Sequence, residues 1–464
     1  MKKQKVTAVF DIGKTNKKFF LFNADFKEVY KEYSQFSEVV DEDGYPTENL
    51  AEFQKWVKGL FDRILKSEKF EIKSINFSTY GASFVHIDKD GNALTPLYNY
   101  LKPIPANIEQ DFIKKYGDIS PETGSPQSGM LNSGMQLYWL KKTKPEIFKK
   151  IKYSLHFPQY LSYLFTGIPV SEFTSIGCHT ALWNYESNDY HNWVYEEKIN
   201  EKLPPLVSAQ TYISMNYQDK RIKVGVGIHD SSSALLPYIF SEKKPFLLLS
   251  TGTWSIALNP FNESKLTKKD IDNNCLNYMQ IDGKRVKATR FFLGNEYKLQ
   301  VKKLSTHYKK EYGVHRSVKF NKTLYLKLIK EPSNYFKFEE IRLKRNQLDE
   351  TNLQPFKTFE EAFHQLMIEL IEIQIITIKM AIGETEIKKI YIDGGFTDND
   401  IFVKLIAHHF NKFKVKTTKS PLGSALGSAM VMGKKQLNKK FLKENYKMQT
   451  LIPLQLTQTE PKVR

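Results

Sequence analysis

A strand–turn–strand pattern occurs twice in this chain, about half a chain apart. In the first copy, two β-rich runs within residues 6–22 flank a polar turn that follows Asp11 and Gly13. In the second copy, two apolar runs within residues 246–258 flank the turn STGT at 250–253. Each copy predicts a β-hairpin. The repeat indicates an internal duplication, and two unrelated hairpins remain the alternative.

The first turn carries groups that suit phosphate. Residues 14–18, KTNKK, offer lysines, a hydroxyl and an amide, and successive backbone N–H groups in such a turn can cradle phosphate oxygens. A P-loop does not explain it, because the glycine that this motif needs five residues earlier is replaced by Ala8. A dinucleotide-binding fingerprint also fails, since GVGIHD at 225–230 ends in aspartate instead of a third glycine.

The composition predicts a folded chain of two to three domains. The sequence has 464 residues, of which 41% are hydrophobic, enough for sizeable cores. No run reaches the ~18 apolar residues of a membrane helix, and we expect the apolar run at the N-terminus to be a strand rather than a signal peptide. Cys178 and Cys275 form no metal-binding spacing, which predicts a reducing, cytoplasmic location.

The net charge of +18 suits polyanionic partners, nucleotide phosphates among them. The lysines and arginines are scattered along the chain, and no known nucleic-acid module surrounds them. The sequence therefore argues against nucleic acid as the partner. The alternative interpretation is that the lysines only solvate the surface.

Strand-like and helix-like periodicities alternate downstream of the first hairpin. Helical periodicity covers 50–65 and 359–382. A strand at 388–392 precedes Asp-Gly-Gly, and Thr397 is placed to cap the next helix. Small residues recur in LGSALGSAM, which predicts a closely packed last helix that starts at Ser420-Pro421. The pattern is that of an α/β protein.

Two further motifs are ambiguous when each is taken alone. Gly394 and Gly395 end a strand before a helix, where the backbone can approach an anionic ligand, but strand-to-helix turns often use glycine. Asp230 follows a Gly-rich strand and is either a functional carboxylate or a plain helix cap.

Together, five motifs in this order resemble the FGGY carbohydrate kinases, in the ATPase superfamily that also holds actin, hexokinase and the heat-shock chaperones. They are an Asp-x-Gly hairpin, Gly-x-Gly-x-x-Asp, the STGT hairpin, Asp-Gly-Gly and the small-residue helix, spread over residues 6–433. Within the family the chain looks most like rhamnulokinases and related deoxy-ketose kinases. That likeness is carried by TYGASFVHIDKDG (79–91), QLYWLKKTKPEIF (136–148), PQYLSYLFTG (158–167), HDSSSAL (229–235) and STGTWS (250–255).

The resemblance implies an α/β fold of two actin-like (ribonuclease H-like) ATPase domains with a cleft between them, divided as 1–235 and 236–464. It also implies a phosphotransferase that uses ATP and Mg²⁺. The implied substrate is a ketose phosphorylated at O1, a 6-deoxy-ketohexose such as L-rhamnulose or L-fuculose.

The resemblance further assigns roles to single residues. Asp230 matches the catalytic base, Asp11 the carboxylate that organises Mg²⁺ through water, and Gly81, His229 and Ser231 the sugar contacts. The ATP-binding positions are Asp11, Gly13, Lys14, Thr15, Asn16, Lys17, Lys18, Gly252, Thr253, Gly394 and Gly395.

The chain departs from the family pattern at three of these motifs. Lys14 stands where a small or hydroxyl residue is usual, and Asp393 where a third glycine is frequent. Lys18 replaces an arginine, so it offers a point charge without a planar fork. Arg290 and Asn295 are candidate ligand contacts whose register the sequence leaves open.

Tyr80, Phe84 and Phe291 are expected to neighbour the sugar and to tolerate a terminal methyl group. Other substrates stay open, among them xylulose, ribulose and glycerol. A non-catalytic sugar or nucleotide sensor is the other alternative. The expected partners are a small sugar and ATP, with no membrane, and a homodimer is left open.

Overall fold

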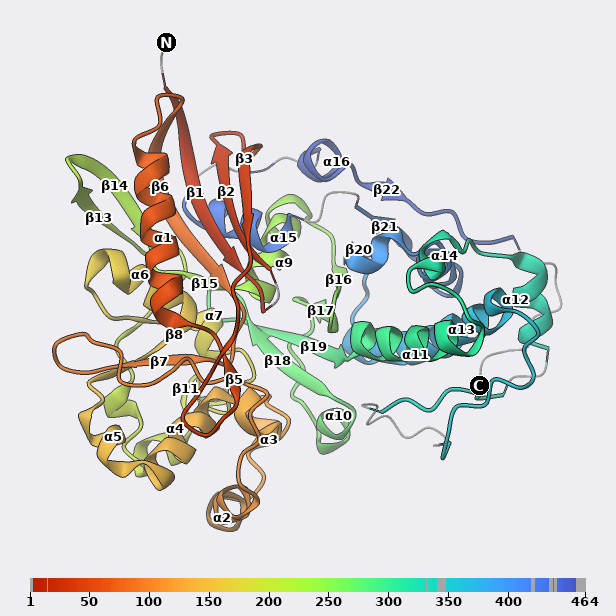
Figure 1. Ribbon diagram of the computed structural model, residues 1–464, viewed down its shortest axis with the longest axis horizontal. Helices are drawn as coiled ribbons and strands as arrows, with labels where there is room; N and C mark the ends of the chain where they lie inside the picture. Colours follow the sequence, from red (N-terminus) through yellow and green to blue (C-terminus); the bar gives the residue numbers. More distant parts are fainter. Residues whose placement is uncertain are drawn as a thin grey trace.

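The computed structural model describes residues 3–14, 16–330, 333–339, 348–418, 422–433, 437 and 440–455. The described chain is an α/β protein with two seven-stranded sheets, which lie side by side in Figure 1. This arrangement agrees with the expected fold class. No helix among the described residues has the length and apolar character needed to span a membrane.

The first sheet comes from the N-terminal half of the chain. Its strand order is β13-β14-β6-β1-β2-β3, and β15 also pairs with β6. The strands are β1 (Gln4–Ile12), β2 (Lys17–Asn23), β3 (Glu28–Ser34), β6 (Phe70–Thr79), β13 (Tyr212–Tyr217), β14 (Lys220–Gly225) and β15 (Ile228–His229).

Helices and short strands surround this sheet. The helices are α1 (Leu50–Leu65), α2 (Ala106–Tyr116), α3 (Ser120–Thr123), α4 (Ser133–Thr143), α5 (Pro145–Lys150), α6 (Phe157–Thr166), α7 (Phe173–Ile176) and α8 (Asn192–Glu196). The short strands are β4 (Val39–Val40), β5 (Pro46–Thr47), β7 (Phe84–Ile87), β8 (Tyr153–His156), β9 (Ser171–Glu172), β10 (Trp183–Asn184), β11 (Asp189–Tyr190) and β12 (Leu206–Val207).

The second sheet has the order β18-β19-β17-β16-β20-β21-β22. Its strands are β16 (Phe246–Thr251), β17 (Ser255–Asn259), β18 (Cys275–Met279), β19 (Arg285–Phe291), β20 (Lys389–Gly394), β21 (Lys414–Thr417) and β22 (Gln449–Thr450). The helices in the second half of the chain are α9 (Asp230–Ser241), α10 (Lys268–Asp272), α11 (Leu293–His307), α12 (Lys322–Leu328), α13 (Phe359–Ile382), α14 (Asp400–His409), α15 (Gly423–Val431) and α16 (Phe441–Tyr446).

The two sheets repeat the same pattern of pairing. In each, the first hairpin strand (β1 or β16) is antiparallel to the strand that follows it and parallel to a later strand (β6 or β20). That later strand is parallel to a further one (β14 or β21), which has an antiparallel outer neighbour. This shared topology favours an internal duplication over two unrelated hairpins.

The long helices have the predicted bounds, but one predicted cap is wrong. Asn399 caps α14, because its side-chain oxygen accepts from the backbone N–H of Phe402 at 3.0 Å. The hydroxyl of Thr397 donates instead to the carbonyl of Gly394 at 2.8 Å, within the preceding 3₁₀ turn. The predicted helix start at Ser420-Pro421 lies outside the described residues.

The small-residue helix α15 packs closely, as predicted. It lies against α9, β1 and β6, and Figure 1 shows it in blue beside the green α9. A Cβ on Gly427 would lie 1.8 Å from the carbonyl oxygen of Ser233 on α9. The side-chain amide of Asn76 on β6 donates to the carbonyl of Ser428 at 2.9 Å. A helix late in the sequence therefore completes the first half of the molecule.

Candidate active site

The first hairpin places Lys18 beside Asp11. The two residues are cross-strand partners on β1 and β2, and the ammonium of Lys18 lies 3.8 Å from Asp11 Oδ2. Burial raises the pKa of Asp11, and the charge of Asp230 adds to this effect, while Lys18 and a hydrogen bond from Ser424 oppose it. Two carboxylates far apart in the sequence, Asp11 and Asp230, are therefore close enough for their charges to interact.

The other residues of the turn are arranged differently from one another. Lys17 and Lys18 point to opposite faces of the sheet, because successive side chains of a strand alternate between its faces. The ammonium of Lys17 is buried and lies 2.9 Å from Glu48 Oε1. Lys14 lies 3.1 Å from Glu38. The structure thus places Lys18, but not Lys17, beside Asp11.

The turn itself is closed by a backbone hydrogen bond. The N–H of Gly13 donates to the carbonyl of Asn16 at 2.9 Å. The predicted phosphate contact Thr15 lies outside the described residues.

Asp230 is the first residue of α9 and does not cap the helix. The cap position belongs to His229, and Asp230 Oδ1 accepts from the hydroxyl of Ser231 at 3.2 Å. Its side chain is 32% exposed, yet the surrounding protein raises its pKa to about 6 by desolvation, while hydrogen bonds from the backbone N–H and hydroxyl of Ser231 and the charge of Lys18 oppose the shift. Of the two sequence interpretations, the plain helix cap is wrong.

His229 and Gly81 are in direct contact beside this carboxylate. A Cβ on Gly81 would lie 2.8 Å from the imidazole of His229, so only glycine fits there. His229 Nε2 lies 3.3 Å from Asp230 Oδ1 and 3.1 Å from Cys178 Sγ. Burial lowers the pKa of His229 to about 3, which keeps the ring neutral. The structure brings together the three sugar-side predictions and Asp230, and it adds Cys178.

The second turn packs against the start of α11. Gly252 donates to the carbonyl of Trp254 at 2.9 Å, and Gly294 donates to the carbonyl of Thr253 at 3.0 Å. A Cβ on Gly294 would lie 2.3 Å from the carbonyl oxygen of Gly252. This contact packs the segment 289–297 against the second turn.

The two candidate contacts in that segment lie on different elements. Arg290 is on β19, where its guanidinium reaches the hydroxyl of Ser128 at 2.5 Å and lies 5.4 Å from the ring centre of Trp254. Asn295 lies in the first turn of α11.

The Asp-Gly-Gly turn is joined to the second hairpin. Thr251 Oγ1 donates to the carbonyl of Asp393 at 2.6 Å and accepts from the N–H of Phe396 at 3.1 Å. Gly394 has φ +92°, and a Cβ there would lie 1.9 Å from the carbonyl oxygen of Thr251. Gly395 has open space around it. The first glycine is thus required by packing, and the second leaves room for a ligand.

The three aromatic residues expected near the sugar all belong to hydrophobic cores. Phe84 stacks on His156 with 3.9 Å between ring centres, and the placement of these residues beside the sugar stays a prediction. Tyr80 precedes Gly81 and lies 5.9 Å from Tyr100 between ring centres.

Tyr100 belongs to the site and was missed in the sequence. Burial raises its pKa to about 12, and the charges of Asp230 and Glu48 contribute. Neither Tyr100 nor Cys178 lies in a recognisable sequence motif. Each is brought close to the other site residues only by contacts that the fold creates.

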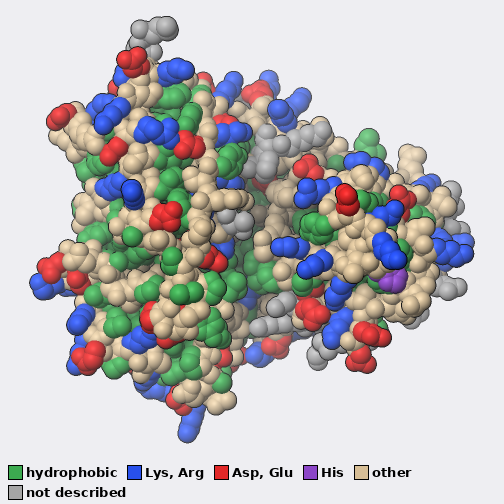
Figure 2. Space-filling view, viewed as in Figure 1, with side chains coloured by type: hydrophobic (Ala, Val, Ile, Leu, Met, Phe, Trp, Pro, Cys, Tyr) green, Lys and Arg blue, Asp and Glu red, His purple; other side chains and the backbone are tan. Residues whose placement is uncertain are grey.

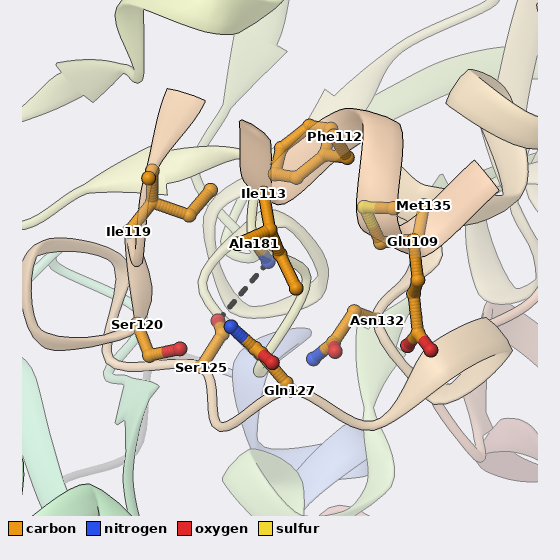
Figure 3. Close-up of a pocket in the computed structure, with 11 residues that line it drawn as sticks. Glu109, Phe112, Ile113, Ile119, Ser120, Ser125, Gln127, Asn132, Met135 and Ala181 are labelled. Atoms are coloured by element: carbon orange, nitrogen blue, oxygen red, sulfur yellow. Dashed lines mark hydrogen bonds between the residues drawn. The ribbon is translucent and has the colours of Figure 1, made fainter. Parts of the chain in front are cut away.

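A separate small pocket lies away from these residues. It is enclosed by α2, the loop around Ile119 and α4, and Figure 3 shows apolar side chains such as Phe112 and Met135 on its walls. The described residues that line it include none of the predicted site residues. The surface is instead indented between the halves that contain the two sheets (Figure 2).

The repeated sheets and the paired turns define a two-domain protein of actin-like fold. Solved carbohydrate kinases share it: one from Novosphingobium aromaticivorans has a TM-score of 0.79 at 21% identity and covers 98% of this chain and 95% of its own. Xylulose kinase from Lactobacillus acidophilus has a TM-score of 0.78 at 17% identity, covering 97% and 93%. Plasmodium falciparum glycerol kinase with ADP has a TM-score of 0.70 at 16% identity, covering 92% and 89%.

The sequence comparisons find a family model that matches the N-terminal part of the chain. The model for the N-terminal domain of the FGGY family of carbohydrate kinases matches residues 6–235. Residues 6–235 therefore match an FGGY carbohydrate kinase N-terminal domain.

Curated relatives include two rhamnulokinases. That of Halalkalibacterium halodurans is 26% identical over 195 residues, or 39% of this chain. That of Oceanobacillus iheyensis is 24% identical over 222 residues, or 44% of this chain. The matches span 41% and 45% of the relatives' own lengths.

Proposed function

We propose that the protein is an ATP-dependent carbohydrate kinase, which transfers the terminal phosphoryl group of ATP to a hydroxyl group of a ketose. The observation that carries this proposal is the electrostatic interaction among Asp230, Asp11 and Lys18: Lys18 lies 3.8 Å from Asp11, and the charge of Asp230 acts on Asp11 while that of Lys18 acts on Asp230. Phosphoryl transfer depends mainly on positioning and charge neutralisation, with a carboxylate to accept the proton of the attacking hydroxyl. The three side chains supply a base, a metal-organising carboxylate and a cation.

Asp230 acts as the base in this proposal. A carboxylate with a pKa of about 6 is ionised at neutral pH and more basic than an ordinary aspartate, which suits proton abstraction. The hydroxyl of the sugar would approach over Gly81. Lys18 and the backbone of the two turns would face the phosphates of ATP, and Gly394-Gly395 the adenosine.

The residues around Asp11 fit Mg²⁺. Magnesium prefers carboxylate oxygens and is usually held by one or two of them together with substrate phosphates. Asp11 is buried and its pKa is raised partly by the charge of Asp230, a pairing that a cation would relieve. Among the described residues, no larger cluster of His, Cys, Asp or Glu could hold a metal. Bound with ATP, Mg²⁺ would neutralise phosphate charge.

The chain divides into the domains 1–235 and 236–464 in this proposal. The division falls within α9, which leads from β15 of the first sheet to β16 of the second. Such a connection lets the two halves move relative to each other around bound ligands. A cytoplasmic location is also proposed, because ATP is the donor and both cysteines are buried free thiols.

The proposed substrate is a 6-deoxy-ketohexose, L-rhamnulose or L-fuculose, phosphorylated at O1. Two curated relatives are named rhamnulokinases, and the rings of Tyr80 and Tyr100 offer apolar surface near Gly81 for a methyl group. Solved neighbours named for xylulose and glycerol share the fold, so these compounds belong in any test.

A substrate panel tests the proposal. Coupled ADP release should be measured with L-rhamnulose, L-fuculose, D-xylulose, L-ribulose, glycerol and D-gluconate. We expect the highest kcat/KM for one of the two 6-deoxy-ketohexoses. A preference for glycerol or gluconate would contradict the substrate, and the absence of any sugar-stimulated turnover would favour the sensor alternative.

The pH dependence of activity follows from Asp230. The ionised carboxylate is the active form, and its pKa is raised to about 6. We therefore expect kcat/KM to fall about tenfold per pH unit below about pH 5.5 and to level off above about pH 7. Initial rates from pH 5 to 8 at low sugar concentration, with coupling enzymes in excess, measure this limb. A flat profile down to pH 5 would contradict the assignment.

Thr253→Val tests the second turn. The change removes a hydroxyl from an exposed turn residue while it preserves the side-chain shape. We expect the KM for ATP to rise roughly three- to tenfold, since a hydrogen bond to a charged group contributes about 1.5 kcal/mol or less at an exposed site. Thr253→Ser, which keeps the hydroxyl, is the matched control. Equal ATP kinetics in both variants would place the phosphates elsewhere.

A further inference from the structure

The segment 172–178 runs next to His229. Near its start, the hydroxyl of Thr174 is held in one orientation by Glu172. Glu172 is buried, and its carboxylate accepts from the backbone N–H of Thr174 at 2.8 Å and from Thr174 Oγ1 at 2.6 Å. Because a threonine hydroxyl has one proton to donate, this bond fixes its orientation. Its lone pairs remain available to accept.

The hydroxyl of Thr174 accepts from the main chain just before Asp230. The backbone N–H of His229 donates to Thr174 Oγ1 at 3.0 Å. His229 ends β15, where it pairs with Thr79 of β6, and the next residue begins α9. The bond therefore fixes the backbone from which Asp230 projects.

Cys178, at the other end of the segment, contacts the ring of the same histidine. Its sulfur lies 3.1 Å from Nε2, which is also 3.3 Å from Asp230 Oδ1. A neutral imidazole has one N–H, and a carboxylate can only accept, so the proton belongs on Nε2. Consistently, His229 Nδ1 is buried without a hydrogen-bond partner among the described residues.

Two donors thus converge on one oxygen of Asp230. The ring of His229 and the hydroxyl of Ser231 both contact Oδ1, at 3.3 Å and 3.2 Å. The backbone N–H of Ser231 also donates to this carboxylate. In the proposed reaction, Oδ2 receives the proton of a substrate hydroxyl.

We propose that Thr174 and Cys178 are positioning residues for Asp230 and act through His229. Thr174 holds the backbone of His229, Cys178 holds its ring, and the ring holds Oδ1 so that Oδ2 faces the substrate. This inference rests on the proposed kinase function, in which Asp230 is the base.

Thr174→Val and Thr174→Ser form the first test. Valine keeps the shape but removes the acceptor for His229, whereas serine keeps the hydroxyl. Because a shift of about 1 Å in a reacting group can cost up to roughly 100-fold in rate, we expect kcat to fall about 10- to 100-fold in the valine variant. The KM for ATP should stay within about twofold, and serine should restore most of kcat. Equal kcat for valine and wild type, or equal loss in both variants, would overturn the role of Thr174.

Cys178→Ala is the second test, and it leaves no buried polar group unpaired. We expect about a tenfold lower kcat with an unchanged KM for ATP, since the ring of His229 loses its neighbour. Cys275→Ala is the matched control, because Cys275 is equally buried but packs with Leu266 and Ile271. Thermal unfolding of both proteins separates lost stability from lost positioning. Wild-type kcat in Cys178→Ala would overturn the role of Cys178. If Thr174→Val does not fold, the comparison of Cys178→Ala with Cys275→Ala tests the proposal.

The tautomer of His229 gives a readout that needs no turnover. In ¹⁵N-histidine-labelled protein, the signals of His229 are identified by their loss in His229→Gln. We expect a neutral ring protonated on Nε2 at pH 7, and protonation on Nδ1 would overturn the arrangement. If the wild type shows the expected tautomer but no sugar-stimulated ADP release, the proposed kinase function is refuted. Asp230 would then not act as a base, and Thr174 and Cys178 would have no catalytic group to position.

Discussion

Asp230→Asn is expected to lower kcat by roughly 10²–10⁴-fold, the usual contribution of a positioned general base. An amide cannot accept the proton of the sugar hydroxyl, whereas its shape still fits beside Ser231 and His229. Since Asp230 is not the cap of α9, the helix should persist. Coupled ADP release gives kcat, and calorimetric titration with ATP shows whether the nucleotide still binds.

The control for this variant is an aspartate with no role in the site. Asp282 lies on the surface, 3.3 Å from Lys284, so Asp282→Asn changes the net charge equally. We expect its kcat to equal that of the wild type. If Asp230→Asn kept more than about a tenth of the wild-type kcat, Asp230 would not be the base.

The adjacent glycines 394 and 395 should respond oppositely to alanine. At Gly394 the backbone has φ +92° and a Cβ would lie 1.9 Å from the carbonyl oxygen of Thr251. Backbone strain and overpacking each cost about 1–3 kcal/mol, so we expect Gly394→Ala to lose roughly 2–6 kcal/mol of stability. At Gly395 no atom lies within 4 Å of the added Cβ, so stability should change little.

Thermal unfolding and ATP kinetics together test this pair. We expect the apparent melting temperature of Gly394→Ala to fall by about 5 °C or more. Gly395→Ala should melt like the wild type but show a higher KM for ATP, because its methyl group would enter the space proposed for adenosine. A stable Gly394→Ala protein would contradict the close contact with β16. An unchanged KM for ATP in Gly395→Ala would remove adenosine from this turn.

The sequence predicted the local elements well. The hairpins at Asp11 and at STGT are both present, and α1 and α13 have the predicted bounds. Hydrophobic periodicity and turn residues act within a few positions of each other, so they can be read from the chain. The predicted cap of α14 was wrong because the hydroxyl of Thr397 bonds within the preceding turn, and Asn399 caps the helix instead. Hydrophobic periodicity does not distinguish between two neighbouring polar residues.

The candidate site was predicted only in part. Asp11, Lys18, Gly81, His229 and Asp230 were named from motifs, and the fold brings them together. Cys178 and Tyr100 were missed, since neither has a local signal. Phe84 lies in a hydrophobic core, and its aromatic character alone does not separate a ligand wall from a core position.

The sequence by itself determined the α/β class, the two hairpins, the packing of the small-residue helix and the set of polar residues available for chemistry. Only the tertiary structure decided how those residues act on one another. It directed Lys18 to Asp11 and Lys17 to Glu48, raised the pKa of Asp230 to about 6, and put the ring of His229 between Cys178 and Asp230. The physical reason is that burial and electrostatic contacts join residues far apart in the chain, whereas periodicity and turn chemistry are fixed by near neighbours.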